Sequence, residues 1–124
     1  MSQEITTNAS LEYSDSEGTT MAPLQATNER ASVATKKILR TKQSVGTSEE
    51  AVVLGECTSP GKFMLKNLDP TNYIEVKTGT GGVVCGKMLA GESYGPVRLG
   101  SGMQSPYVIA NTASCQMEVA VIQT

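Results

Sequence analysis

The sequence contains no histidine and no tryptophan, only one phenylalanine, and no apolar run long enough to cross a bilayer. The absence of histidine removes the commonest general base, the Ser-His and Cys-His nucleophile pairs, and most zinc and haem sites. The carboxylates are scattered, and the closest pair, Glu49 and Glu50, lies in an expected turn where a solvated or capping role is favoured. We therefore expect a chain that is not an enzyme and that holds no cofactor and no metal.

Strong charge of one sign is also missing, since 10 basic and 12 acidic residues give a formal net charge of −2. Nucleic-acid-binding domains usually present a strongly basic surface, so we do not expect nucleic acid as a partner. With neither an apolar span nor a charged and then apolar N-terminus, we expect no membrane segment and no signal peptide, and a chain kept in a cytoplasm. In that reducing compartment the widely spaced Cys57, Cys85 and Cys115 predict buried, unbridged thiols.

Residues that favour strands and turns dominate what is present. The chain has 12 glycines and 5 prolines, and valine and threonine recur throughout. After residue 50, short β-branched or alternating segments are separated by turn residues, which predicts strands near residues 62–68, 73–77, 83–89, 96–99, 107–110 and 115–122. Such spacing is typical of a sandwich or a small barrel. We therefore predict an all-β fold whose residues 51–124 form a small antiparallel, jelly-roll-like β-sandwich.

The first 50 residues are richer in Ser, Thr, Asn and Gln and predict an extended N-terminal arm with one or two strands. Leu11 and Tyr13 lie in an alternating segment that fits a half-buried strand. Residues 19–32 have no clear period, so we expect them to be mobile or ordered by a neighbour. Residues 33–42 predict a second strand, and the S/T-x-x-E spacing of residues 47–50 predicts a single helical turn.

One segment partly matches the sequence motif of a phosphate-binding loop. Residues 81–87 satisfy G-x-x-x-x-G-K, but Met88 stands where that motif needs a Ser or Thr hydroxyl for Mg²⁺. The loop also has to lead into a helix, and no helical period follows it. We therefore predict a glycine turn followed by a strand in which Gly86 marks a bulge or a close approach.

A basic cluster is the clearest candidate for a binding site. Its five cations, with no acidic residue between them, are Arg30, Lys36, Lys37, Arg40 and Lys42. Two interpretations remain open: a solvated face, or a strip that docks on an acidic protein surface or on nucleic acid inside an assembly. No aromatic stacking partner is nearby, which makes single-stranded nucleic acid the weaker partner. We predict that this cluster binds a partner together with Leu11 and Tyr13 of the arm.

Six segments combine turn residues with short strand-like runs, and they carry a resemblance to a known class of proteins. They are residues 47–56, 59–61, 63–76, 89–92, 97–99 and 106–113. Together with the arm, they resemble small structural proteins of tailed bacteriophages, although Gly95-Pro96 departs from that pattern. The resemblance implies a virion component without enzyme activity, assembled in the bacterial host cytoplasm. A capsid decoration or cement protein that binds the major capsid protein, as a homotrimer or homodimer, fits best.

Other functions remain as alternatives. A head-tail connector, tail or fibre-base protein of the same virion would differ from a decoration protein in its copy number per particle. A small carbohydrate-binding or receptor-binding β module would need a concave site lined by aromatic or carboxylate side chains. The few aromatic residues, Phe63 and four tyrosines, weaken that second alternative.

Overall fold

The computed structural model describes residues 4–14, 20–32, 38–55, 57, 60–100 and 106–123. Strands are the regular secondary structure of these residues, and no helix occurs among them, which confirms the all-β class predicted from the sequence. The strands are β1 (Glu4–Ser14), β2 (Thr20–Ser32), β3 (Ile38–Val45), β4 (Glu50–Ala51), β5 (Pro60–Asn67), β6 (Ile74–Lys77), β7 (Val84–Met88), β8 (Ser93–Arg98), β9 (Tyr107–Ala110) and β10 (Cys115–Gln123). None of the described residues belongs to a helix that is long and apolar enough to span a bilayer.

The chain divides into two compact units, Met1–Ala34 and Thr35–Thr124. This division lies earlier than the boundary expected after residue 50. The reason is β3, which pairs with β10 from Ile38 to Val45 and so belongs to the second unit. The inward positions of β3 include the polar Thr41 and Gln43, so the strand does not show an alternation of apolar and polar residues in the sequence.

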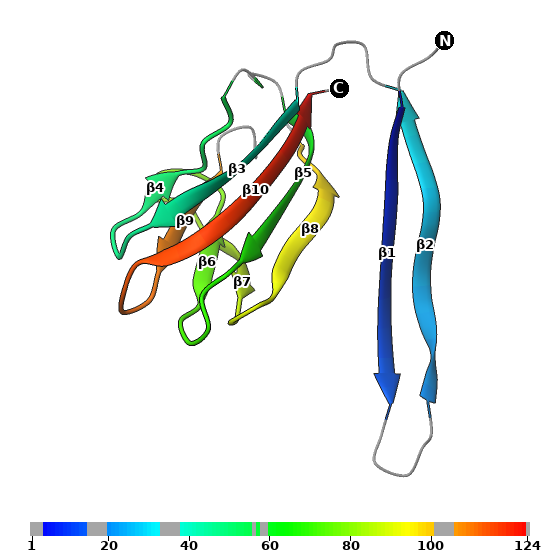
Figure 1. Ribbon diagram of the computed structural model, residues 1–124, viewed down its shortest axis with the longest axis horizontal. Helices are drawn as coiled ribbons and strands as arrows, with labels where there is room; N and C mark the ends of the chain where they lie inside the picture. Colours follow the sequence, from blue (N-terminus) through cyan, green and yellow to red (C-terminus); the bar gives the residue numbers. More distant parts are fainter. Residues whose placement is uncertain are drawn as a thin grey trace. The chain divides into compact units, whose positions relative to one another are not determined.

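The second unit is a sandwich of two four-stranded sheets (Figure 1). One sheet has the order β3-β10-β5-β8 and the other has the order β4-β9-β6-β7, with antiparallel pairing throughout. Their inner faces share one hydrophobic core. Its buried members include Val45, Phe63, Leu65, Ile74, Val76, Met88, Val108, Met117, Val119 and Val121.

Alternation along each strand explains why these residues form the core. In β10 the buried positions are Cys115, Met117, Val119 and Val121, and the residues between them are more exposed. Successive side chains of a strand point to opposite faces, so one face of β10 is apolar and the other is open to solvent. The strands expected near residues 62–68, 73–77, 83–89, 107–110 and 115–122 are confirmed as β5, β6, β7, β9 and β10.

The first unit is a hairpin in which β1 pairs antiparallel with β2 to give a two-stranded sheet. Residues 19–32 were expected to be mobile or to be ordered by a neighbour, and Thr20–Ser32 is a strand that pairs with β1. Backbone pairing with β1, rather than a periodic apolar face, orders this segment.

Three local features differ from, or decide between, the structures expected from the sequence. Residues 47–49 form a bend instead of the expected helical turn, and the Glu50 carboxylate accepts a hydrogen bond from Gly46 N at 3.2 Å. Residues 84–88 form a strand and not the loop-to-helix junction that a phosphate-binding motif requires. Cys85 is exposed, which corrects the expectation of three buried thiols. Val76 of β6 is opposite Gly86 and the next residue, Lys77, is opposite Val84, so Cys85 is the extra residue of a bulge in β7, and a bulge interrupts the alternation of side chains.

Candidate functional site

The outer face of the sheet β3-β10-β5-β8 collects cations from three of its four strands. We call it the basic face and define it by the outward-pointing residues Arg40, Lys42, Lys62, Lys66, Arg98 and Glu118, with the apolar Ile38, Met64, Ala120 and Ile122 between them. Among the described residues on this face, Glu118 is the single carboxylate beside five cations.

The register of the strands sets the arrangement of these charges. Glu118 on β10 is directly opposite Lys42 on β3 and Lys66 on β5. Directly opposed residues of antiparallel strands point to the same side of the sheet, with Cβ atoms about 5 Å apart. Lys62 and Arg98 form another such pair between β5 and β8. One carboxylate therefore lies in a row between two lysines.

Glu118 makes its strongest contact with Arg40. Nε and Nη2 of Arg40 donate hydrogen bonds to the same carboxylate oxygen, Oε1, at 3.1 and 2.7 Å. These bonds, followed by the charges of Lys42 and Lys66, hold the pKa of Glu118 below its usual value. The Arg40 side chain is nevertheless 78% exposed, so water competes for this contact and its net contribution to stability is small.

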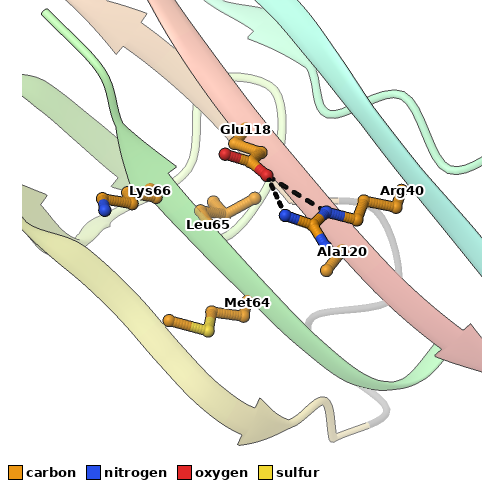
Figure 2. Close-up of a pocket in the computed structure, with 6 residues that line it drawn as sticks. All are labelled: Arg40, Met64, Leu65, Lys66, Glu118 and Ala120. Carbon is orange, nitrogen blue, oxygen red and sulfur yellow. Dashed lines mark hydrogen bonds and ion pairs between the residues drawn. The ribbon is translucent and has the colours of Figure 1, made fainter.

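A shallow hollow lies beside this ion pair. It has a volume of about 350 Å³ and is lined by Arg40, Met64, Leu65, Lys66, Glu118 and Ala120. Figure 2 shows the Arg40–Glu118 contact above β10, with Lys66 and Met64 on the neighbouring β5. Met64 is 36% exposed. The hollow thus combines an apolar floor with charged side chains at its edge.

The structure places two of the five cations of the predicted cluster on this face. Arg40 and Lys42 are two positions apart and both point to the outer side of β3, as expected for a strand. Lys36 and Lys37 lie outside the described residues. Arg30 belongs to β2 of the hairpin unit, where its backbone is opposite Thr6. Among the described members of the predicted cluster, Arg40 and Lys42 thus belong to the sandwich and Arg30 belongs to the hairpin unit.

The two arm residues of the predicted site both lie on β1. Leu11 is paired with Leu24 of β2 and is 68% exposed. Tyr13 is paired with Met21. The early part of the arm is thus a strand as expected, and Leu11 presents an apolar side chain to solvent instead of being half-buried.

Sequence reasoning missed Lys62, Lys66 and Arg98. Lys62, Met64 and Lys66 alternate with the buried Phe63 and Leu65, so the alternation could have placed both lysines on the outer face of a strand. Their proximity to Arg40 and Lys42 could not have been read in that way. It depends on β10 lying between β3 and β5, and β10 is far from both in the sequence.

A second cluster of polar groups surrounds Glu49 and has a structural role. Its carboxylate accepts hydrogen bonds from Lys77 Nζ, from Thr80 Oγ1 at 2.9 Å and from Gly81 N at 2.8 Å. These bonds, with that of Lys77 the largest cause, lower the pKa of Glu49 to about 2. Within the described part of the chain, no group of three or more Cys, Asp or Glu side chains is placed to hold a metal ion.

Comparison with known proteins gives no relative, because no protein-family model, no curated protein and no solved structure matches this chain. Function is therefore inferred from the residues and their geometry.

Proposed function

We propose that this chain is a non-enzymatic structural protein of a tailed-phage virion, most simply a decoration or cement protein that binds and stabilises the major capsid shell. The observation that carries the proposal is the division of the chain into a packed sandwich and a separate two-stranded hairpin. The resemblance of the turn and strand segments to small phage structural proteins supports the same conclusion.

Among the described residues, the sheet of the hairpin has two strands and no third. Its strands are long and mostly polar, with 11 residues in β1 and 13 in β2. An isolated two-stranded hairpin is marginally stable in water, because ordering the backbone costs about 1–2 kcal/mol per residue and few apolar groups are buried in return. Binding to another protein supplies the missing contacts, and the strand edges can pair with a partner strand. The hairpin is thus suited to reach a neighbouring subunit.

The strand order of the sandwich also fits this role. β3 and β5 lie in one sheet while β4 and β6 lie in the other, and the same alternation recurs toward β10. A chain wound as a jelly roll produces the orders β3-β10-β5-β8 and β4-β9-β6-β7. Jelly rolls are common in viral capsid proteins and also in lectins. The placement of the aromatic residues therefore has to separate those two possibilities.

A carbohydrate-binding module needs aromatic rings that are open to a sugar. Phe63 and Tyr94 pack edge to face with ring centroids 5.9 Å apart. Lys87 Nζ lies over the ring of Tyr73 at 4.0 Å. Three of the aromatic side chains in the described residues are thus occupied by contacts within the chain, which favours a structural role over sugar binding.

Copy number in purified particles tests the proposal. We expect quantitative mass spectrometry to find on the order of hundreds of copies per particle, as binding across a symmetric shell requires. About a dozen copies would instead indicate a connector, tail or fibre-base protein. Particles without the chain would contradict any virion role. Sedimentation of the purified protein is expected to give a homotrimer or a homodimer.

The contribution of the hairpin has its own test. A chain without residues 1–34 is expected to fold but to be lost from particles during purification, because the contacts supplied by β1 and β2 are gone. Circular dichroism checks folding, and occupancy is measured by adding the truncated chain to particles that lack it. Full occupancy by the truncated chain would show that the hairpin is not required for attachment.

A further inference from the structure

The basic face has an excess of positive charge that the chain as a whole does not share. Five cations and one carboxylate lie on this face among the described residues, while the formal net charge of the whole chain is −2. Glu118 lies between Lys42 and Lys66 and also accepts both hydrogen bonds from Arg40. One carboxylate is therefore shared among three cations, and the face attracts further negative charge.

We propose that the basic face is the docking surface for an extended acidic segment of a partner protein, and that Glu118 occupies the place of one partner carboxylate in the unbound chain. This inference rests on the proposed structural role and names the chemistry of the partner: a segment in which acidic and apolar side chains alternate. Its carboxylates pair with Lys42, Lys66 and Arg40, and an apolar side chain lies in the hollow over Met64 and Ala120.

The apolar floor favours a protein over a nucleic acid as the partner. Met64 and Ala120 lie between the cations, and Ile38 is 68% exposed at the end of β3. A phosphate backbone gains nothing from such groups, whereas an alternating peptide covers them. Single strands usually bind by stacking bases on aromatic rings. Within the sandwich, the described aromatic residues lie away from the outer face of this sheet: Phe63 and Tyr94 pack on each other, and Tyr73 and Tyr107 lie near or on the other sheet.

The Arg40–Glu118 contact can be exchanged at little cost. Both hydrogen bonds from Arg40 go to the single oxygen Oε1, and the Arg40 side chain is 78% exposed. An incoming carboxylate therefore replaces a weak, solvated contact with a similar one. Glu118 thus acts as an internal competitor: it keeps Arg40 extended over the sheet while lowering the affinity for the acidic segment.

The test measures binding of a short fluorescein-labelled peptide of alternating glutamate and leucine by fluorescence anisotropy. Lys66→Glu is expected to weaken binding by about fivefold or more, since it replaces an attraction with a repulsion. Lys87→Glu is the matched control, because it changes the net charge equally but lies on β7 of the other sheet. An equal loss of peptide binding in the two variants would overturn the docking surface, because the net charge of the protein would then explain the binding.

Glu118→Gln separates competition from positioning. If Glu118 competes with the partner, this variant binds the peptide roughly threefold more tightly, because Arg40 is released and one negative charge is removed. If Glu118 instead holds Arg40 in a required position, the variant binds more weakly, which would overturn the competitor role. Thermal melting of each variant establishes that the sandwich is still folded.

Two further measurements complete the test. A single-stranded DNA oligonucleotide that binds the face more tightly than the peptide would overturn a protein partner, and so would a wild-type chain that fails to bind the peptide at low salt. Particle occupancy is measured separately. If the chain is present on particles at high copy number but does not bind the peptide, only the acidic-segment inference is contradicted. If particles do not contain the chain, the structural role is contradicted.

Discussion

The ring of Tyr94 on β8 occupies the space that a side chain on Gly86 of β7 would need. A Cβ built on Gly86 would overlap the Tyr94 ring, and that ring also packs edge to face against Phe63. The strands β7 and β8 are terminal strands of different sheets, so this contact closes one side of the sandwich. The close approach expected from an isolated glycine in a strand is confirmed.

Gly86→Ala is therefore expected to destabilise the fold by about 1–3 kcal/mol, because the added methyl group displaces the Tyr94 ring from its position in the core. Urea denaturation followed by circular dichroism measures the change. Gly100→Ala is the control, since a Cβ there meets no atom of the described residues within 4 Å. Combining Gly86→Ala with Tyr94→Leu should reduce the penalty, and strictly additive effects would contradict the proposed overlap.

Glu49 provides a pH-dependent contribution to stability. Its hydrogen bonds from Lys77, Thr80 and Gly81 lower its pKa from 4.5 to about 2. The stabilisation is therefore fully present above pH 4.5 and is lost as the pH falls toward about 2. We expect Glu49→Gln to lower the urea midpoint at pH 7 and to have progressively less effect between pH 4.5 and pH 2.

A second carboxylate on the same part of the sandwich gives the control for this measurement. Glu75→Gln on β6 removes the same charge without touching the contacts of Glu49. A Glu49→Gln penalty that stays constant across the pH range would contradict the ionised hydrogen-bonded carboxylate. Chemical-shift titration of the Glu49 carboxyl group by NMR measures its pKa directly.

The sequence predicted those features of the fold that depend on neighbouring residues. The alternation of Ile74 and Val76 with Glu75 and Lys77 was enough to place the strand β6 and its buried face. By contrast, β2 has no apolar period, because it is ordered by backbone pairing with β1, and β3 places Thr41 and Gln43 on its inner side. Composition therefore assigned both segments to a polar arm, although only β2 lies outside the sandwich.

The candidate site was predictable only in part, for a related reason. Arg40 and Lys42 are close in sequence and belong to one strand, so their common face could be predicted. By contrast, the register of three strands that are distant in sequence places Glu118 between Lys42 and Lys66. No local pattern encodes that register.

The position of the unit boundary leads to a prediction about truncation. A chain that begins at Thr35 keeps β3, and we expect it to melt as cooperatively as the sandwich of the full chain. A chain that begins at Ala51 loses β3, which exposes the edge of β10 and removes Val45 from the core together with the partly buried Leu39 that packs against it. Removal of buried side chains of this size costs about 1–5 kcal/mol each. We expect this shorter chain to be unfolded or aggregated by circular dichroism and size-exclusion chromatography. Equal stability of the two truncated chains would contradict the assignment of β3 to the sandwich.

Asn67 is the buried polar residue on which the turn after β5 depends. Its side-chain Nδ2 donates to the carbonyl oxygens of Asn72 at 2.8 Å, Met88 at 3.1 Å and Leu89 at 3.3 Å. Its Oδ1 accepts a hydrogen bond from Asp69 N at 2.9 Å, and the residue is fully buried. Loss of the amide leaves buried carbonyl groups without this donor, so Asn67→Ala is expected to cost about 1–3 kcal/mol of unfolding free energy.

Asn67→Asp keeps the shape of the side chain but places carboxylate oxygens against those carbonyl oxygens. We expect a penalty above about 3 kcal/mol at pH 7, because a buried charge is left without a partner. Protonation restores a donor, so the pKa of the new carboxyl group in the folded state is raised and the penalty decreases as the pH falls through that value. Asn111→Asp is the matched control, because Asn111 Oδ1 only accepts a hydrogen bond from Tyr73 N in this contact, which a carboxylate also does. Urea midpoints from pH 7 to pH 4 measure both variants, and equal penalties for the two would show that Asn67 is not required as a donor.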